Sequence, residues 1–370
     1  MKTFFICTTN ITRGAEIVLK DYLSNNTHTK NISIITNNKH EVKFFFSDIC
    51  VQHVYANCFF SATGGSKTIM GFLKKIYFVV RGSIYLRKLI LLEKPSHLVG
   101  NNTGDILFFW IKKTLSRKNK PRTIQLIHDM INTGYYKLIL KIGNPFVDHF
   151  VAVSEAVKAS LVKNGIDEKR ITVIYNGIKK SEMLKKDYDN NKINIGFVGA
   201  IEHRKSPLST ILLIDLLAEK LRTFYFAYSE VKQTILKKLI TGKQKEKILF
   251  FQKLDRDALY KNIYDNIYFL FIPSFSEPFP TVMLEALSLG IPVIARAEGG
   301  IVECVVDKFN GFLFKNDCEL ILIANKIGVL NNREYQKMCH NAYCTAQNFT
   351  LEMKRKKLNA IIFEDQQAHE

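Results

Sequence analysis

The fold is decided by the stretch IYFLFIPSFSEPFPTVMLEALSLGIPVIAR, residues 267–296. It opens with an apolar run at 267–274, crosses a polar loop with two prolines, continues in a helical pattern and closes with a second apolar run at 292–296. Nearly continuous apolar runs are typical of strands that helices cover on both faces of a parallel sheet. Two such strands joined by a helix form a right-handed βαβ unit. The stretch therefore predicts a doubly wound α/β domain.

The same alternation continues through all 370 residues, which are too many for one ordinary core, so we expect two domains. The other predicted strands are residues 3–7, 32–35, 42–46, 97–100, 123–128, 149–154, 171–175, 193–199, 223–229 and 247–252. The lysine-rich segment 179–192 has no strong periodicity and is the expected linker. We predict a Rossmann-like domain at 1–178, a second at 193–348, and a C-terminal helix within 349–370 that crosses back to the first.

Ligands of open parallel sheets bind outside the carboxyl ends of the strands. Two such sheets that face each other would form a cleft between the domains. We therefore predict an α/β protein of two facing, doubly wound Rossmann-like domains, with its chemistry in the interdomain cleft.

The helix after the loop SEPFP begins with several polar groups. Pro280 suits the first helical turn, where its missing N–H costs nothing. The amides of Thr281 and Val282 then lack intrahelical partners and form an anion site suited to a diphosphate. Glu277 precedes this site, and Glu285 lies about one turn beyond Thr281, where a carboxylate can accept hydrogen bonds from vicinal hydroxyls. The alternative is that Glu277 only complements the helix dipole and that Glu285 is a solvated helix residue.

The string EPFPTVMLEAL (277–287) closely resembles the E-x7-E motif of the family-four retaining glycosyltransferases, which have the two-Rossmann-domain GT-B fold. The segments GIPVIARAEGGIVECVVDKFNGFLF (290–314) and DHFVAVSEAVKASLVKNGIDEKRITVIYNGI (148–178) resemble the same family. The resemblance is specific at the level of the family and says nothing about the sugar.

Residue by residue, the resemblance implies that Glu277 contacts hydroxyls of the donor sugar and that Glu285 contacts the ribose of the nucleotide. The amides of Thr281 and Val282 would hold the phosphates. The resemblance also implies retention of the anomeric configuration, by attack on the face from which the phosphate departs.

A basic turn lies in the segment INIGFVGAIEHRKSP (193–207), where a strand ends and a helix begins. A departing nucleoside diphosphate gains charge in the transition state, and fixed cations aimed at it lower the barrier. We predict Arg204 and Lys205 as catalytic phosphate ligands; a surface pair without a role is the alternative. The family usually reads G-R-x-x-x-x-K-G here. This chain lacks the first arginine and has Ser206 in place of the last glycine, but Arg204 beside Lys205 matches the R-K-G variant of some members.

The first half offers two further candidates. Gly14 follows the first strand and would let the backbone approach a phosphate of the donor, although a plain turn glycine is the alternative. His128 ends the apolar run at 123–128, where a cleft residue belongs. Family members commonly have a cleft histidine at this position, which implies that His128 binds the transferred sugar; a structural histidine is the alternative.

Positive charge is concentrated in the first half. The formal net charge is +19, and residues 1–180 hold 27 Lys and Arg against 11 Asp and Glu, whereas residues 181–370 hold 26 against 23. We therefore expect the first half to face an anionic partner, with a merely solubilising surface as the alternative.

The segment 65–94 has apolar residues at helical spacing, interleaved with lysine and arginine. Half of the apolar stripe is expected to pack on the sheet, and the rest to lie on an anionic membrane surface. A solvated face and nucleic-acid contact are the alternatives, but no recognised nucleic-acid motif accompanies the charge. No apolar run reaches the ~18–20 residues that cross a bilayer. The first apolar run is too short for a signal-peptide core, so we expect a cytoplasmic protein, peripheral at the inner face of the membrane.

We expect no metal and no cofactor other than the donor, because protein cations would neutralise the diphosphate. The seven cysteines include no C-x-x-C pair, which favours thiols in a reducing cytoplasm over a zinc site. Of the two D-x-D strings, Asp187 and Asp189 fall in the linker, and Asp255 and Asp257 are expected to begin a helix.

Together these features predict a hexosyltransferase that moves a sugar from a nucleoside-diphosphate donor, UDP-linked, to a saccharide or lipid-linked acceptor in the synthesis of a surface polysaccharide or lipopolysaccharide. A sugar-nucleotide epimerase of similar fold is one alternative and would convert the donor without an acceptor. A non-catalytic glycan- or lipid-binding protein is the other and would need no donor site.

Overall fold

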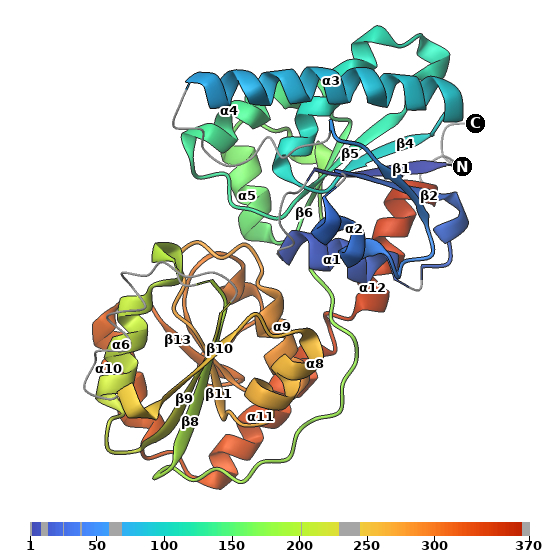
Figure 1. The fold of residues 1–370 in the computed structure, drawn as a ribbon. Coiled ribbons are helices and arrows are strands. Elements are labelled where there is room, and N and C mark those ends of the chain that lie inside the picture. The colour runs from blue at the N-terminus through green and yellow to red at the C-terminus, as the bar shows by residue number, and fades with distance from the viewer. Residues whose placement is uncertain are drawn as a thin grey trace. The chain divides into compact units, whose positions relative to one another are not determined.

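The computed structural model describes residues 2–8, 14–24, 26–37, 39–58, 69–200, 202–228 and 245–364 (Figure 1). The chain forms two compact units. Unit 1 contains Met1–Asn176 and Leu351–Glu370, and unit 2 contains Gly177–Thr350. Each unit has one parallel sheet with helices on both faces (Figure 1).

The sheet of unit 1 has the spatial order β3-β2-β1-β4-β5-β6-β7 among the described residues, and all of its pairs are parallel. Its strands are β1 (Thr3–Cys7), β2 (Ile32–Thr36), β3 (Gln52–Tyr55), β4 (His97–Gly100), β5 (Arg122–Ile127), β6 (His149–Ala152) and β7 (Ile171–Val173). In the centre, Phe5 of β1 pairs with Ile34 of β2 and with Val99 of β4. The strand order reverses between β1 and β4.

The sheet of unit 1 is covered by apolar helix faces (Figure 1). The helices are α1 (Gly14–Leu23), α2 (His40–Phe46), α3 (Ile69–Glu93), α4 (Gly134–Gly143), α5 (Glu155–Lys163) and α12 (Leu351–Asn359). The last helix packs against α1, where the Tyr22 hydroxyl donates a hydrogen bond to Asn359 Oδ1 at 2.6 Å. The C-terminal segment therefore completes the core of unit 1.

Residues 42–46 form a helix, so the predicted strand at this position was wrong. Helix α2 buries Val42 and Phe46, which are four residues apart, and leaves Phe44 75% exposed. The two buried residues are spaced as on one face of a helix, so this apolar run forms a helix and not a strand. The strand that the prediction missed is β3, an edge strand with partly exposed residues whose alternation is weak.

Unit 2 has a parallel sheet with the order β10-β9-β8-β11-β12-β13 among the described residues. Its strands are β8 (Ile193–Val198), β9 (Leu221–Tyr228), β10 (Ile248–Gln252), β11 (Phe269–Ile272), β12 (Val293–Arg296) and β13 (Gly311–Phe314). Its helices are α6 (Pro207–Leu216), α8 (Arg256–Leu259), α9 (Thr281–Ser288), α10 (Asp317–Ile327) and α11 (Asn332–Ala346). The short edge strand β13 was not predicted.

The segment 179–192 packs on unit 2. Tyr188 is only 7% exposed, and its ring stacks on that of Tyr335 in α11 with centroids 4.6 Å apart. The Tyr188 hydroxyl donates a hydrogen bond to the carbonyl of Ile327 at 2.7 Å. This aromatic contact anchors the segment to the core beneath β11.

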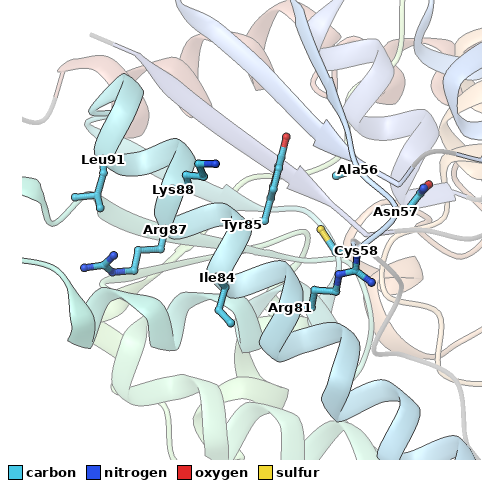
Figure 2. A pocket seen from close by; sticks show the side chains of 9 residues that line it. All are labelled: Ala56, Asn57, Cys58, Arg81, Ile84, Tyr85, Arg87, Lys88 and Leu91. Atoms are coloured by element: carbon cyan, nitrogen blue, oxygen red, sulfur yellow. The ribbon is translucent and has the colours of Figure 1, made fainter.

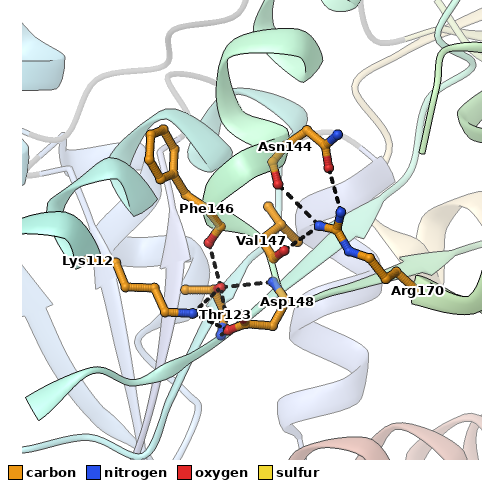
Figure 3. A network of polar contacts seen from close by, with 7 residues as sticks. All are labelled: Lys112, Thr123, Asn144, Phe146, Val147, Asp148 and Arg170. Carbon is orange, nitrogen blue, oxygen red and sulfur yellow. Dashed lines mark hydrogen bonds and ion pairs between the residues drawn. The ribbon is translucent and has the colours of Figure 1, made fainter. Parts of the chain in front are cut away.

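A polar network ties together the amino ends of β5 and β6 (Figure 3). Asp148 accepts a hydrogen bond from the Thr123 amide at 2.8 Å and pairs with Lys112. Burial raises the pKa of Asp148, but hydrogen bonds from Lys112 and Thr123 outweigh it and lower the pKa. Beside it, Arg170 donates to Asn144 Oδ1 at 3.0 Å. Because ligands bind at the opposite, carboxyl ends of parallel strands, we assign this network to stability.

Candidate functional site

The strand order of unit 2 reverses between β8 and β11, and ligands of doubly wound sheets bind outside the carboxyl ends of the strands at such a reversal. Strand β8 leads to a short 3-10 turn at His203–Lys205, and β11 leads to the loop 273–280 before α9. The Phe275 amide donates a hydrogen bond to the Arg204 carbonyl at 2.8 Å. The two connections therefore form one surface.

Three predicted site residues meet on this surface. The Glu277 carboxylate, only 4% exposed, forms an ion pair with Lys205 and another with Arg204, whose NH1 lies 3.3 Å from Glu277 Oε1. Burial raises the pKa of Glu277, but the charges of Lys205 and Arg204 outweigh burial and leave the pKa below its usual value. Glu277 is therefore an ionised carboxylate held by two cations, and not only a partner of the helix dipole.

The turn that carries the cations has a strained backbone. Ser206 has φ 45° and ψ 61°, which is the left-handed conformation that glycine adopts most easily. The glycine that the family usually has at this position would fit the turn without strain. Arg204 also pairs with Glu202 at 3.2 Å, so its guanidinium is shared between two carboxylates.

Two glycines fix the loop that carries Glu277. The Gly300 amide donates to the Glu277 carbonyl at 2.9 Å. A Cβ atom on Gly299, which has φ +60°, would lie 1.9 Å from that carbonyl oxygen, and one on Gly300 would lie 1.9 Å from the Pro278 carbonyl oxygen. Larger residues at 299 and 300 would therefore push the Glu277 loop away from the cations.

A buried arginine at the end of the neighbouring strand supports the same loop. Arg296, at the end of β12, donates from Nε to the Pro273 carbonyl at 3.1 Å and from NH1 to the Lys315 carbonyl at 2.9 Å. Its guanidinium lies over the ring of Phe275, 4.2 Å from the centroid. These contacts are to backbone carbonyls and to a ring of the loop. Arg296 therefore positions the loop that carries Glu277.

Helix α9 begins one residue later than predicted, with Pro280 as its N-cap. The Met283 amide donates to the Pro280 carbonyl at 3.2 Å, and the amides of Thr281 and Val282 have no acceptor among the residues that the structure describes. Both residues are partly exposed. Their N–H groups and the helix dipole therefore offer the anion site that the sequence predicts.

Glu285 lies inside α9 and is 6% exposed, so it is not a solvated helix residue. The Tyr264 hydroxyl donates to Glu285 Oε2 at 2.7 Å, and Arg256 NH2 lies 3.5 Å from Oε1. Burial raises the pKa of Tyr264 well above its ordinary value, and the Glu285 charge raises it further, so the phenol remains a neutral donor. Contact of Glu285 with a ribose stays a prediction.

His128 lies in unit 1, directly after β5, where it meets Asn101 at the end of β4. His128 Nε2 is 3.2 Å from Asn101 Oδ1, and Asn101 Nδ2 donates to the Ala15 carbonyl at 3.3 Å. Because Nδ2 of Asn101 donates to Ala15, its Oδ1 accepts from His128. The imidazole therefore has its N–H on Nε2, and Nδ1 is left as an acceptor. Burial and the nearby Lys354 charge lower the pKa of His128 to about 3. His128 is thus a neutral hydrogen-bonding group.

A buried carboxylate fixes the backbone around Asn101. Asp105 accepts hydrogen bonds from the amides of Thr8, Asn101 and Asn102 at 3.1, 3.1 and 2.8 Å, and also from the Thr8 hydroxyl. Burial outweighs the hydrogen bonds from Thr8 and Asn102, which lower the pKa of Asp105, and raises it to about 7. Four donors around one carboxyl group fit its ionised form. This network joins the ends of β1 and β4, at the reversal of the unit 1 sheet.

Gly14 is the first residue of α1, and a Cβ atom added to it would meet no described atom within 4 Å. Packing within the described part of unit 1 therefore does not require glycine at this position. Its contact with a phosphate stays a prediction.

The first acid of each D-x-D string has a structural partner. Asp255 is the N-cap of α8 and accepts from the Ala258 amide at 2.8 Å, and Asp187 accepts from Asn332 Nδ2 at 3.2 Å. Across the described residues, no group of three or more His, Cys, Asp and Glu side chains is placed to hold a metal ion.

Several partners of the predicted residues were missed by sequence reasoning. They are Asn101 beside His128, Tyr264 and Arg256 beside Glu285, and Gly299 and Gly300 beside the Glu277 loop. Asn101 had a usable signal, because it is a polar residue directly after an apolar run. The others come from distant segments and had no local signal.

In the parts of the chain that the structure describes, no helix has the length and apolar character needed to span a bilayer.

Comparison with known proteins finds relatives of the chain. An uncharacterized glycosyltransferase of Methanocaldococcus jannaschii is 29% identical over 232 residues, which are 60% of this chain and 62% of that protein. The O-antigen chain mannosyltransferase RfbU of Salmonella typhimurium is 26% identical over 166 residues, 44% of this chain and 46% of that protein. The matches thus span about half the length of these relatives. The crystal structure of Anabaena HepE with UDP-glucose has a TM-score of 0.76 and 18% identity, and covers 98% of this chain and 99% of HepE.

The family models divide the chain in two. The model of Glycosyltransferase Family 4 matches residues 36–182, and that of Glycosyl transferases group 1 matches residues 179–346. The predicted family and the predicted class of two doubly wound α/β domains are confirmed. The chain is a member of glycosyltransferase family 4, the group 1 glycosyl transferases, with the α/β domains of the GT-B fold.

Proposed function

We propose that the protein is a retaining glycosyltransferase that moves a hexosyl unit from a UDP-linked sugar to a saccharide acceptor of a surface polysaccharide or lipopolysaccharide. The observation that carries the proposal is the meeting of Arg204, Lys205 and Glu277 on the surface next to the first amides of α9.

The chemistry of this surface suits the departure of a nucleoside diphosphate. The amides of Thr281 and Val282 would bind the phosphates, and Arg204 and Lys205 would neutralise the charge that grows on the leaving oxygen. Each cation would then bind both a phosphate and Glu277. Because the cations are shared, oxygen lone pairs of Glu277 become available to accept hydrogen bonds from sugar hydroxyls. Retention is proposed on the family resemblance of the motif around Glu277.

The relatives support the classes of donor and acceptor. HepE has been crystallised with UDP and with UDP-glucose, and RfbU is an O-antigen chain mannosyltransferase. A UDP-linked sugar and a saccharide acceptor are therefore the first substrates to test. The base and the sugar differ among members of one family, because a few hydrogen bonds decide specificity.

The test measures calorimetric binding of UDP, UDP-glucose and GDP-mannose to the wild type, and then transfer to lipid-linked saccharides. We expect Lys205→Gln to weaken UDP binding about tenfold or more, as loss of a charge-assisted hydrogen bond predicts. We expect Glu277→Ala to abolish transfer while UDP still binds. Lys192→Gln is the matched control, since Lys192 is an exposed cation at the amino end of β8.

Three results would contradict the proposal: no affinity for any nucleotide sugar, full transfer by Glu277→Ala, or conversion of the donor sugar without an acceptor. The last result would identify an epimerase. The anomeric configuration of the product, read by NMR, tests retention separately.

A further inference from the structure

Helix α3 is attached to unit 1 by one face only (Figure 1). Leu86 and Ile90 on this face are fully buried, and Gly82 lies so close to Phe108 that an added Cβ atom would be 2.6 Å from its ring. The inward face is therefore fixed, and the side chains on the opposite face of the helix point away from the core of unit 1.

The outward face has an apolar stripe, spaced by three and four residues from 70 to 84 and continued seven residues later at 91, and its members are between 37% and 75% exposed. We define the stripe as Met70, Leu73, Tyr77, Val80, Ile84 and Leu91. A row of exposed apolar side chains on one helix is typical of an interaction surface. At ~1.5 Å per residue, the 25 residues of α3 extend for about 37 Å.

Cations flank the stripe at every seventh residue. Lys74, Arg81 and Lys88 are exposed, and Arg87 stands within the line of the stripe. The one acid of α3 is Glu93, which ends the helix and pairs with Lys2. Among the described residues, Arg87 and Lys88 have no ion-pair partner. The surface thus combines apolar side chains with uncompensated positive charge.

A cavity of about 670 Å³ opens beside this face (Figure 2). Figure 2 shows Arg81 reaching toward Cys58 and Asn57, which follow β3, with Tyr85 and Lys88 further along the helix. The lining contains three cations and a phenol but no carboxylate. Such a lining suits a phosphate that is attached to an apolar body.

The charge pattern decides between two possible occupants. A second copy of α3 would place its own lysines and arginines beside these, with no acids opposite them on the stripe, and like charges at such positions repel. An anionic bilayer surface offers phosphates to the cations and an acyl boundary to the stripe, as in helices that lie in the interface. The charge is too high for α3 to cross the bilayer.

We propose that the outward face of α3 docks the protein on an anionic phospholipid membrane, with the apolar stripe in the acyl boundary and a head-group phosphate in the cavity beside Arg81 and Lys88. This docking does not depend on the proposed transfer reaction, because it is measured without any donor sugar.

The experiment is flotation of the full chain with vesicles of phosphatidylcholine alone or of equal parts of phosphatidylcholine and phosphatidylglycerol. We expect binding to the anionic vesicles only. The double variant Arg81→Gln, Lys88→Gln should lower the partition coefficient by about 25-fold, since each juxtamembrane cation contributes about fivefold. Val80→Ser with Ile84→Ser should lower it by about tenfold or more, through loss of apolar insertion.

The matched control is Lys163→Gln with Lys169→Gln, which removes the same charge from exposed positions elsewhere in unit 1 and should leave binding unchanged. Circular dichroism and an unaltered melting temperature establish that each variant is folded. An equal loss in the control, or equal binding to neutral vesicles, would overturn the proposal.

Two further results would also overturn it. Inorganic phosphate that binds to the wild type, and not to the Arg81→Gln, Lys88→Gln variant, but leaves flotation with anionic vesicles unchanged would assign the cavity to a soluble anion. A wild-type dimer in light scattering that the stripe variant converts to a monomer would assign the surface to a second copy.

Discussion

At the scale of single residues, the two acids of one motif have different surroundings. Glu277 faces two cations at the surface where β8 and β11 end, whereas Glu285 faces a neutral phenol and a more distant guanidinium. The ion pairs make Glu277 responsive to any anion that competes for Lys205. The phenol holds Glu285 in one orientation. Sugar contact for the first acid and ribose contact for the second stay proposals.

His128 should make stability depend on pH. Its folded pKa of about 3 lies below the ordinary 6.5, so the unfolded chain binds more protons between these values and stability falls as pH falls. At one pH unit below 6.5 the cost is about 1.4 kcal/mol. We expect His128→Gln to lose about that much less stability than the wild type between pH 7.5 and about 5.5.

Urea unfolding at the two pH values measures this difference. Equal loss of stability in the wild type and in His128→Gln would show that the imidazole is protonated in the folded protein. The hydrogen bond from Nε2 to Asn101 would then not select a neutral tautomer.

At the scale of elements, α9 contributes its backbone more than its side chains. The first two amides of the helix are available, and Pro280 before them has φ −71° and ψ 129°, an extended conformation. A proline can follow such a residue and can occupy the first helical position without breaking the helix. The amide can therefore be removed with the fold kept.

We expect Thr281→Pro to weaken UDP binding about tenfold or more, because one hydrogen bond to a charged group contributes about 1.5–3 kcal/mol. Thr281→Ala keeps the amide, loses only the hydroxyl and should bind UDP nearly as the wild type does. Calorimetry of both variants is the measurement. Equal affinity of the proline and alanine variants would remove the Thr281 amide from the proposed site.

At the scale of the whole molecule, all of the proposed phosphate ligands except Gly14 fall in one unit. Arg204, Lys205 and the first amides of α9 all belong to unit 2, whereas His128 and Gly14 belong to unit 1. Tight binding of a nucleotide should therefore slow local opening chiefly in unit 2.

Hydrogen exchange with saturating UDP should show slower exchange at residues 202–206 and 281–285, with little change along α3. ADP at the same concentration is the control, because it has the same diphosphate charge as UDP but a different base. If UDP protects mainly amides of unit 1, the assignment of the phosphates to unit 2 is wrong.

Local patterns were sufficient where they were long and regular. The strands around Phe5 and Phe271 are buried apolar runs, and both were predicted within about two residues. The start of α9 was predicted within one residue, because a proline is compatible with only a few helical positions. The edge strand β3 was missed because partial exposure weakens its alternation, and β13 was missed although most of it is buried, because it has only four residues.

The sequence by itself determined two parallel α/β domains and placed Glu277, Thr281 and Val282 around a helix start, because strand burial and helix caps are local properties. Tertiary structure alone decided that Glu277 meets Arg204 and Lys205, more than 70 positions earlier in the chain. It also decided that the Asn101 amide selects the tautomer of His128. Such pairings depend on strand order and on loop geometry, which no local pattern of residues encodes.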